Sequence, residues 1–124
     1  MKFWIYAALF AITACQATPS AVRDISQEKF IEQPPANAVI LDVRTPEEFA
    51  RGHVPNAILI PHTELASRIS ELGTGKGEPI VVYCESGKRA GMAGEILLEA
   101  GFSNVFHLDG DMRGWRENNR PIER

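Results

Sequence analysis

Cysteine is scarce in this chain, and its scarcity limits the chemistry that sulfur can do. Only two of the 124 residues are cysteine, Cys15 and Cys84. Cys15 lies in an N-terminal segment that we expect to be removed or lipidated, so Cys84 has no partner for an internal disulfide. The sequence also lacks a Cys-x-x-Cys pair, which disfavours a dithiol oxidoreductase. A lone thiol of this kind is either a small buried side chain or a working group.

The chain has neither a large charge excess nor a long apolar run. It contains 13 basic and 16 acidic residues, a net charge of −3, so its overall field is not suited to binding nucleic acid or an anionic lipid surface. The apolar run over residues 3–12 would span about 15 Å as a helix, half of a hydrocarbon core of about 30 Å. This length is too short for a membrane span and is typical of the h-region of a signal peptide, with Lys2 as a short positive n-region.

The residues after the apolar run predict where this signal is cut. Residues 12–15, ITAC, resemble a bacterial lipobox, in which the cysteine that follows a small residue becomes lipidated. We therefore expect a lipoprotein-type signal peptide over residues 1–14, lipidation of Cys15, and a tether over residues 15–20. This interpretation places the protein in the bacterial cell envelope, in the periplasm, with membrane contact only through the lipid anchor. The alternative is cleavage after Ala17, which would give a soluble periplasmic or secreted protein.

From residue 21 to residue 124, apolar runs and helix signals alternate, which we interpret as one domain. The apolar runs predict strands over residues 21–25, 38–43, 57–60, 80–83 and 105–108. Helical spacing and end signals, with Ser26 as the cap of the first helix, predict helices over residues 26–33, 45–51, 63–72, 90–100 and 112–118. The alternation predicts an α/β fold with a mostly parallel central sheet and helices on both faces. Ligands of such sheets bind at the carboxyl ends of the strands.

Charged residues surround the end of the second predicted strand. Thr45, Pro46 and Glu48 carry a helix-start pattern, in which threonine caps the helix and glutamate reaches back to the cap amide. Asp42, Arg44 and Glu48 have the composition of an acid–base set. We interpret them as structural: ion pairs and a capping contact that tie the strand to the following loop.

Cys84 closes the apolar strand over residues 80–83 and opens a short polar loop, followed by Glu85, Ser86, Gly87, Lys88 and Arg89. The N-terminus of the next helix would present unpaired amides and the positive end of its dipole to the thiol. Gly87 allows the positive φ that an anion-binding turn needs. Lys88 and Arg89 add two positive charges against one carboxylate. These surroundings favour the thiolate; the alternative is that Cys84 only packs the end of the strand.

Three segments, in the right order, resemble the single-domain rhodanese family. CESGKRA over residues 84–90 is similar to its active-site loop, Cys-x-x-Gly-x-Arg, and LDVRTPEEFARGHVPNAILIP over residues 41–61 resembles its upstream signature. Leu108-Asp109-Gly110 followed by Trp115 is similar to its closing segment, although Asp111 stands where the family usually has a paired glycine. The resemblance covers about residues 21–121 and implies a rhodanese-like fold.

The resemblance also implies a reaction. The Cys84 thiolate would attack the outer sulfur of a small anionic donor such as thiosulfate and become a persulfide, and a thiol or cyanide would then accept the sulfur. Glu85, Ser86, Gly87, Lys88 and Arg89 would form the substrate- and anion-binding loop. The Arg89 guanidinium either binds the donor or forms a structural ion pair. No metal or organic cofactor is implied, and the histidines His53, His62 and His107 lack the spacing of metal ligands.

Other functions of such a loop stay open at this point. Related cysteine-based phosphatases use Cys-x5-Arg, a loop one residue longer, and in this chain Ala90 occupies that arginine position. A non-catalytic rhodanese-like binding module is a second alternative, although the cysteine loop is intact. A third is an envelope redox sensor that uses Cys84, which the absence of a resolving thiol disfavours.

Overall fold

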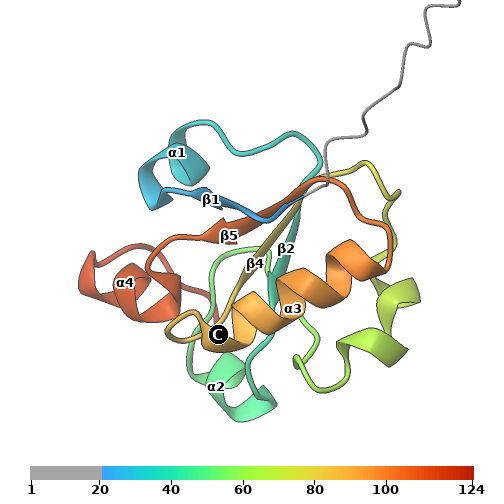
Figure 1. The fold of residues 1–124 in the computed structure, drawn as a ribbon. Coiled ribbons are helices and arrows are strands. Elements are labelled where there is room, and N and C mark those ends of the chain that lie inside the picture. The colour runs from blue at the N-terminus through green and yellow to red at the C-terminus, as the bar shows by residue number, and fades with distance from the viewer. Residues whose placement is uncertain (1–20) are drawn as a thin grey trace, which may run out of the picture.

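A computed structural model describes residues 21–124, in which a five-stranded sheet lies between helices (Figure 1). The strands are β1 Arg23–Ile25, β2 Val39–Asp42, β3 Ile58–Leu59, β4 Ile80–Tyr83 and β5 Val105–Leu108. They are ordered β1-β5-β4-β2-β3, and every pair is parallel. The α-helices are α1 Gln27–Glu32, α2 Pro46–Arg51, α3 Lys88–Glu99 and α4 Asp111–Glu117. The predicted α/β fold with a parallel sheet is confirmed.

The central strand β4 divides the interior into two cores. Its four residues are all buried, and successive side chains of a strand point to opposite faces. Ile80, Val82 and Cys84 therefore join the core under α3, together with Leu97. Val81 and Tyr83 join the other core, which also contains apolar residues of α1 and α4. Burial on both faces explains why this strand is a continuous apolar run.

The local signals for α1 and α2 are confirmed. The Ser26 side chain caps α1 by accepting a hydrogen bond from the Lys29 amide. Thr45 and Glu48 form the predicted capping box at the start of α2, with Pro46 in its first turn. Gly52 ends α2 with a φ of 146°, a backbone conformation that favours glycine.

Two helix predictions differ from the structure. Residues 63–72 form two short 3-10 segments, Leu65–Ser67 and Ile69–Leu72, instead of one α-helix. The Ser67 hydroxyl donates to the Glu64 carbonyl, a local bond that competes with helix formation. Helix α3 begins two residues earlier than predicted, because Gly87 adopts a φ of 115° and serves as its N-cap.

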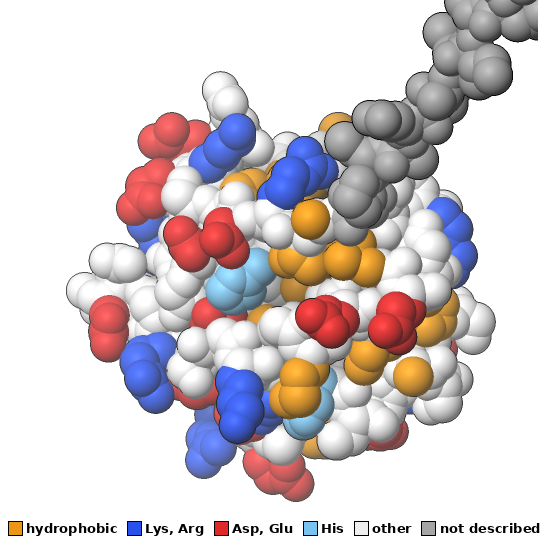
Figure 2. Space-filling view, viewed as in Figure 1, with side chains coloured by type: hydrophobic (Ala, Val, Ile, Leu, Met, Phe, Trp, Pro, Cys, Tyr) orange, Lys and Arg blue, Asp and Glu red, His pale blue; other side chains and the backbone are white. Residues whose placement is uncertain are grey.

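The surface in view is mixed in charge. Acidic, basic and hydrophobic side chains are scattered over the face in view (Figure 2). No helix within residues 21–124 combines the length and apolarity that a membrane crossing requires. The predicted signal peptide over residues 1–14, the tether over residues 15–20 and the lipidation of Cys15 lie outside the described residues and stay predictions.

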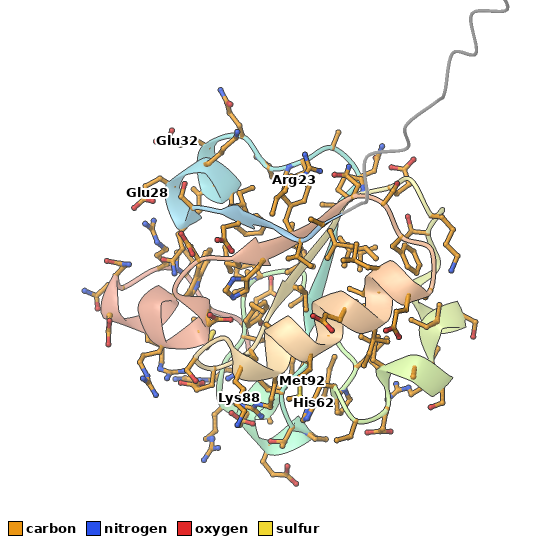
Figure 3. The ribbon with its side chains drawn as sticks, viewed as in Figure 1. Arg23, Glu28, Glu32, His62, Lys88 and Met92 are labelled. Atoms are coloured by element: carbon orange, nitrogen blue, oxygen red, sulfur yellow. The ribbon has the colours of Figure 1, made fainter. Side chains whose placement is uncertain are left out.

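Packing under α3 yields a stability prediction. Leu97 is fully buried against the sheet, whereas Met92 lies on the exposed side of the same helix (Figure 3). We expect Leu97→Ala to lower the free energy of unfolding by about 3 kcal/mol, because it leaves a cavity in the core. The matched change Met92→Ala should stay within about 0.5 kcal/mol of wild type. Urea unfolding of both variants measures the difference, and equal midpoints would contradict this packing.

Candidate active site

The Cys84 sulfur lies at the base of the turn that links β4 to α3. Its Sγ accepts a hydrogen bond from the Gly87 amide at 3.0 Å, and Cys84 is 1 % exposed. Gly87 offers no side chain to cap α3, so the first-turn amides of this helix are not capped by a side chain. The thiol is therefore buried on the core side, and a backbone N–H at the positive end of a helix faces it. The amide would offer a hydrogen bond to a negatively charged sulfur, whereas burial away from water opposes that charge.

Residues at the start of α4 form hydrogen bonds with the backbone of the cysteine loop. The Met112 amide donates to the Cys84 carbonyl at 2.9 Å, and the Arg113 amide donates to the Glu85 carbonyl at 3.1 Å. The Asp111 Oδ1 accepts the Cys84 amide at 3.0 Å. Three backbone groups of the first two loop residues are thus fixed by one neighbouring segment.

The charged side chains of the loop are mostly paired. Arg89 forms a two-pronged ion pair with Glu48, with nitrogen–oxygen distances of 2.6 and 3.0 Å. These hydrogen bonds lower the pKa of Glu48 to about 2. Glu85 bonds Arg116, which lowers the pKa of the Glu85 carboxyl group, and its Oε2 lies 3.4 Å from Arg44 Nη1.

The two positive charges expected at this loop therefore differ in their surroundings. Arg89 lies in the first turn of α3, with its guanidinium held by the Glu48 carboxylate. Lys88 and Ser86 are exposed, and Lys88 extends from the start of α3 (Figure 3). The net positive charge that the side chains bring to the loop is therefore smaller than the sequence alone suggested.

A buried polar network supports the loop from β2 and β4. Arg44 Nη2 bonds Asp42 Oδ2 at 2.8 Å, and the Tyr83 hydroxyl donates to the same oxygen at 2.7 Å. Arg44 also donates to the Gly52 carbonyl at 2.7 Å. Burial and the Asp42 carboxylate raise the pKa of Tyr83, so the phenol stays protonated and keeps its donor role. The structural ion pair between Asp42 and Arg44 is confirmed, whereas sequence reasoning missed Tyr83.

Sequence reasoning also missed His107 and the role of Asp111. His107 Nε2 lies 3.0 Å from both carboxylate oxygens of Asp111, and Nδ1 lies 3.1 Å from Asp24 Oδ1. The bonds to Asp111, followed by those to Asp24, raise the pKa of His107 to about 9. The one sequence signal was the departure from the family pattern at Asp111.

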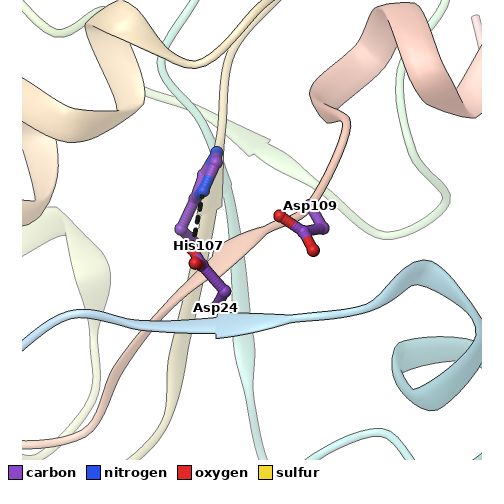
Figure 4. A group of neighbouring side chains, drawn as sticks. All are labelled: Asp24, His107 and Asp109. Carbon is purple, nitrogen blue, oxygen red and sulfur yellow. Dashed lines mark hydrogen bonds and ion pairs between the residues drawn. The ribbon is translucent and has the colours of Figure 1, made fainter.

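The same histidine belongs to a group with the composition of a metal site. Asp24, His107 and Asp109 offer ligand atoms within 4.8 Å of one another (Figure 4). Both ring nitrogens of His107 face carboxylates, and the raised pKa keeps the ring protonated at neutral pH. A protonated imidazole has no lone pair for a cation, so a metal would have to displace this proton before His107 could bind it.

An open cavity adjoins the cysteine loop. Its volume is about 290 Å³. It is lined by Arg44, Glu48, Arg51, Gly52, Glu85, Met112, Arg116 and Ile122. Charges of both signs line the cavity, and Glu85 connects its wall to the cysteine loop. The cavity reaches the cysteine loop at Glu85, and neither Cys84 nor Gly87 lines it.

The Glu48–Arg89 pair predicts a pH dependence of stability. The pKa of Glu48 is depressed in the folded state to about 2, so the pair stabilises the fold above about pH 4.5 and loses this effect as the pH falls through 2. Glu48→Gln should lower the free energy of unfolding by about 1 kcal/mol at pH 7, and this gap should close between pH 4.5 and pH 2. Urea unfolding across that range measures it, with the exposed neighbour Glu47→Gln as control. A gap that does not change with pH would contradict the assignment.

Comparisons with known proteins show which family the chain resembles. The model of the rhodanese-like domain matches residues 26–118. A sulfurtransferase of Allochromatium vinosum is 34% identical over 86 residues, which cover 69% of this chain and 78% of the relative. The thiosulfate sulfurtransferase PspE of Escherichia coli is 40% identical over 70 residues, which cover 56% of this chain and 67% of PspE.

A solved structure gives the same result for the fold. The rhodanese-related protein of Thermoplasma volcanium superposes with a TM-score of 0.72 at 28% identity, covering 82% of this chain and 97% of the other. The matched family region contains the whole cysteine loop and the segments that hold it. The chain therefore belongs to the rhodanese-like domain family.

Proposed function

We propose that this protein is a rhodanese-type sulfurtransferase that moves a sulfane sulfur through a persulfide on Cys84. The observation that carries the proposal is the Gly87 amide directed at the Cys84 sulfur, 3.0 Å away, at the N-terminus of α3. A thiolate held in this way is a nucleophile. The sulfurtransferase names of two relatives support the same reaction class.

The proposed first step forms one sulfur–sulfur bond and breaks another. The Cys84 thiolate attacks the outer sulfur of thiosulfate, and the sulfur–sulfur bond of the donor breaks with its electron pair leaving on sulfite. In the second step, a thiolate or cyanide attacks the outer sulfur of the Cys84 persulfide and restores the Cys84 thiolate. Neither step needs a proton transfer or a cofactor, so the enzyme alternates between two forms.

The loop supports both forms of the enzyme in the same way. The resting thiolate and the persulfide both carry one negative charge, so the same backbone amides stabilise each of them. The cavity of about 290 Å³ beside Glu85 has room for a small anionic donor and opens to solvent, where an acceptor thiol or cyanide can approach. Arg44 and Arg116 lie on its wall, where they can offset part of the donor's charge.

Intact mass measurement tests this function. We expect the full chain to gain one sulfur atom with thiosulfate and to lose it again with cyanide. Cys84→Ser should abolish the gain because it removes the nucleophile, whereas Cys15→Ser, which removes the other cysteine, should preserve it. The absence of any gain with thiosulfate or other sulfane donors would contradict the proposal and favour a binding module.

The same mass measurement distinguishes a sulfurtransferase from a redox sensor. Oxidation to a sulfenic acid or a mixed disulfide, without uptake of sulfur, would favour a sensor that uses Cys84. Among residues 21–124, Cys84 is the one free cysteine and is buried, so the described domain offers no second thiol to resolve such an oxidised state.

We further propose that the protein is a periplasmic lipoprotein anchored through Cys15. The lipobox-like residues 12–15 and the tether after them support this location. Growth of expressing bacteria with labelled palmitate should label the protein, and Cys15→Ala should abolish the label while the protein is still made. Equal labelling of both forms would contradict the anchor, and release of an unlabelled soluble form would favour cleavage after Ala17.

A further inference from the structure

A buried carboxylate lies directly behind the cysteine loop. Asp111 is 2 % exposed and begins α4 with a φ of 54°, a conformation that favours glycine. Its Oδ1 accepts the Cys84 amide at 3.0 Å. A glycine would fit this backbone without strain, yet it could not make that hydrogen bond. The aspartate therefore adds a contact to the backbone of the proposed nucleophile.

Asp111 is closely connected to the sulfur through Gly87. The Gly87 amide bonds Cys84 Sγ, and a Cβ on Gly87 would lie 3.2 Å from Asp111 Oδ2 and 3.9 Å from His107 Nε2. The carboxylate and the imidazole therefore lie on the side of Gly87 where a side chain would project. An unpaired carboxylate at this place would oppose formation of the thiolate, because like charges disfavour one another.

His107 offsets this carboxylate. Its Nε2 lies 3.0 Å from both oxygens of Asp111, and the ring carries a positive charge at neutral pH because its pKa is raised to about 9 by Asp111 and then by Asp24. His107 lies in β5, and Asp111, four residues later, is the first residue of α4.

The other charged groups around the pair and the sulfur are accounted for. Asp24 on β1 bonds His107, and Asp109, which follows β5, has a carboxylate oxygen within 4.8 Å of a His107 ring nitrogen. Glu95 on α3 lines a cavity together with His107 and Gly87. On the loop side, Glu85 is held by Arg116 and Arg44, and Arg89 is held by Glu48. Asp111 is therefore the buried carboxylate that contacts the back of the loop, and His107 is its cationic partner.

We propose that Asp111 and His107 are positioning residues for Cys84: Asp111 fixes the Cys84 amide at the base of the loop, and His107 cancels the charge of Asp111 so that the sulfur can ionise. This inference rests on the proposed sulfurtransferase function. Neither residue lines the cavity beside Glu85. They act on the reaction through the backbone and the electrostatic potential of the loop.

Thiol alkylation measured over a range of pH tests whether His107 offsets the charge of Asp111. This measurement does not depend on sulfur transfer. We expect iodoacetamide to alkylate Cys84, and mass spectrometry follows the alkylation rate. The experiment uses the full chain with Cys15→Ser and compares it with the His107→Gln, Asp111→Asn and doubly substituted variants in the same background. In His107→Gln the midpoint of the pH profile should rise by about one pH unit, because the carboxylate is left uncompensated. Adding Asp111→Asn should return the midpoint towards wild type. Adding Glu117→Gln, which removes an exposed carboxylate at the far end of α4, should not.

A second measurement tests the anchoring role. Asp111→Gly suits the positive φ but removes the acceptor of the Cys84 amide, so sulfur uptake from thiosulfate should slow about tenfold, with Tm reported for every variant to confirm folding. Unchanged alkylation profiles, or equal rescue by Glu117→Gln, would overturn the charge role. An unchanged uptake rate in Asp111→Gly would overturn the anchor. If the wild-type chain takes up no sulfur, the proposed function is contradicted. The alkylation profiles still test the charge role of Asp111 and His107 in that case.

Discussion

The hydrogen bond from the Gly87 amide to the Cys84 sulfur is the interaction on which the rest of the site depends. It requires that β4 end with the sulfur on the α3 side of the sheet and that Gly87 adopt a positive φ as the N-cap of α3. A strand buried on both faces fixes the first condition, and the absence of a side chain at Gly87 permits the second. The sulfur consequently meets the positive end of a helix at short range.

Electrostatics at this loop are local. The chain carries a net charge of −3, and the charged side chains nearest the sulfur are largely neutralised by partners, Arg89 by Glu48 and Glu85 by Arg116. Backbone dipoles therefore provide the field that a thiolate or persulfide would experience, and ion pairs mainly hold the backbone in place. This arrangement suits chemistry that adds and removes one sulfur atom while the charge stays constant.

The sequence predicted the features that depend on neighbouring residues. The apolar run of β4, the cap at Ser26 and the capping box at Thr45 each need only a few adjacent side chains, and each was confirmed. The helix predicted over residues 63–72 was wrong, although it too was predicted from neighbouring residues. Apolar spacing alone could not show that a serine hydroxyl would compete for a backbone carbonyl there. The order of the strands, and therefore which loops meet, was not accessible in this way.

The sequence by itself determined the α/β pattern and the lone cysteine at the end of an apolar strand, because periodicity and helix caps act over short distances along the chain. Only the tertiary structure decided what surrounds that cysteine. Asp111 is 27 residues from Cys84 and Glu48 is 41 residues from Arg89, and these pairs meet because parallel strands bring their carboxyl ends to one edge of the sheet. Residue spacing in the chain carries no record of which side chains will share that edge.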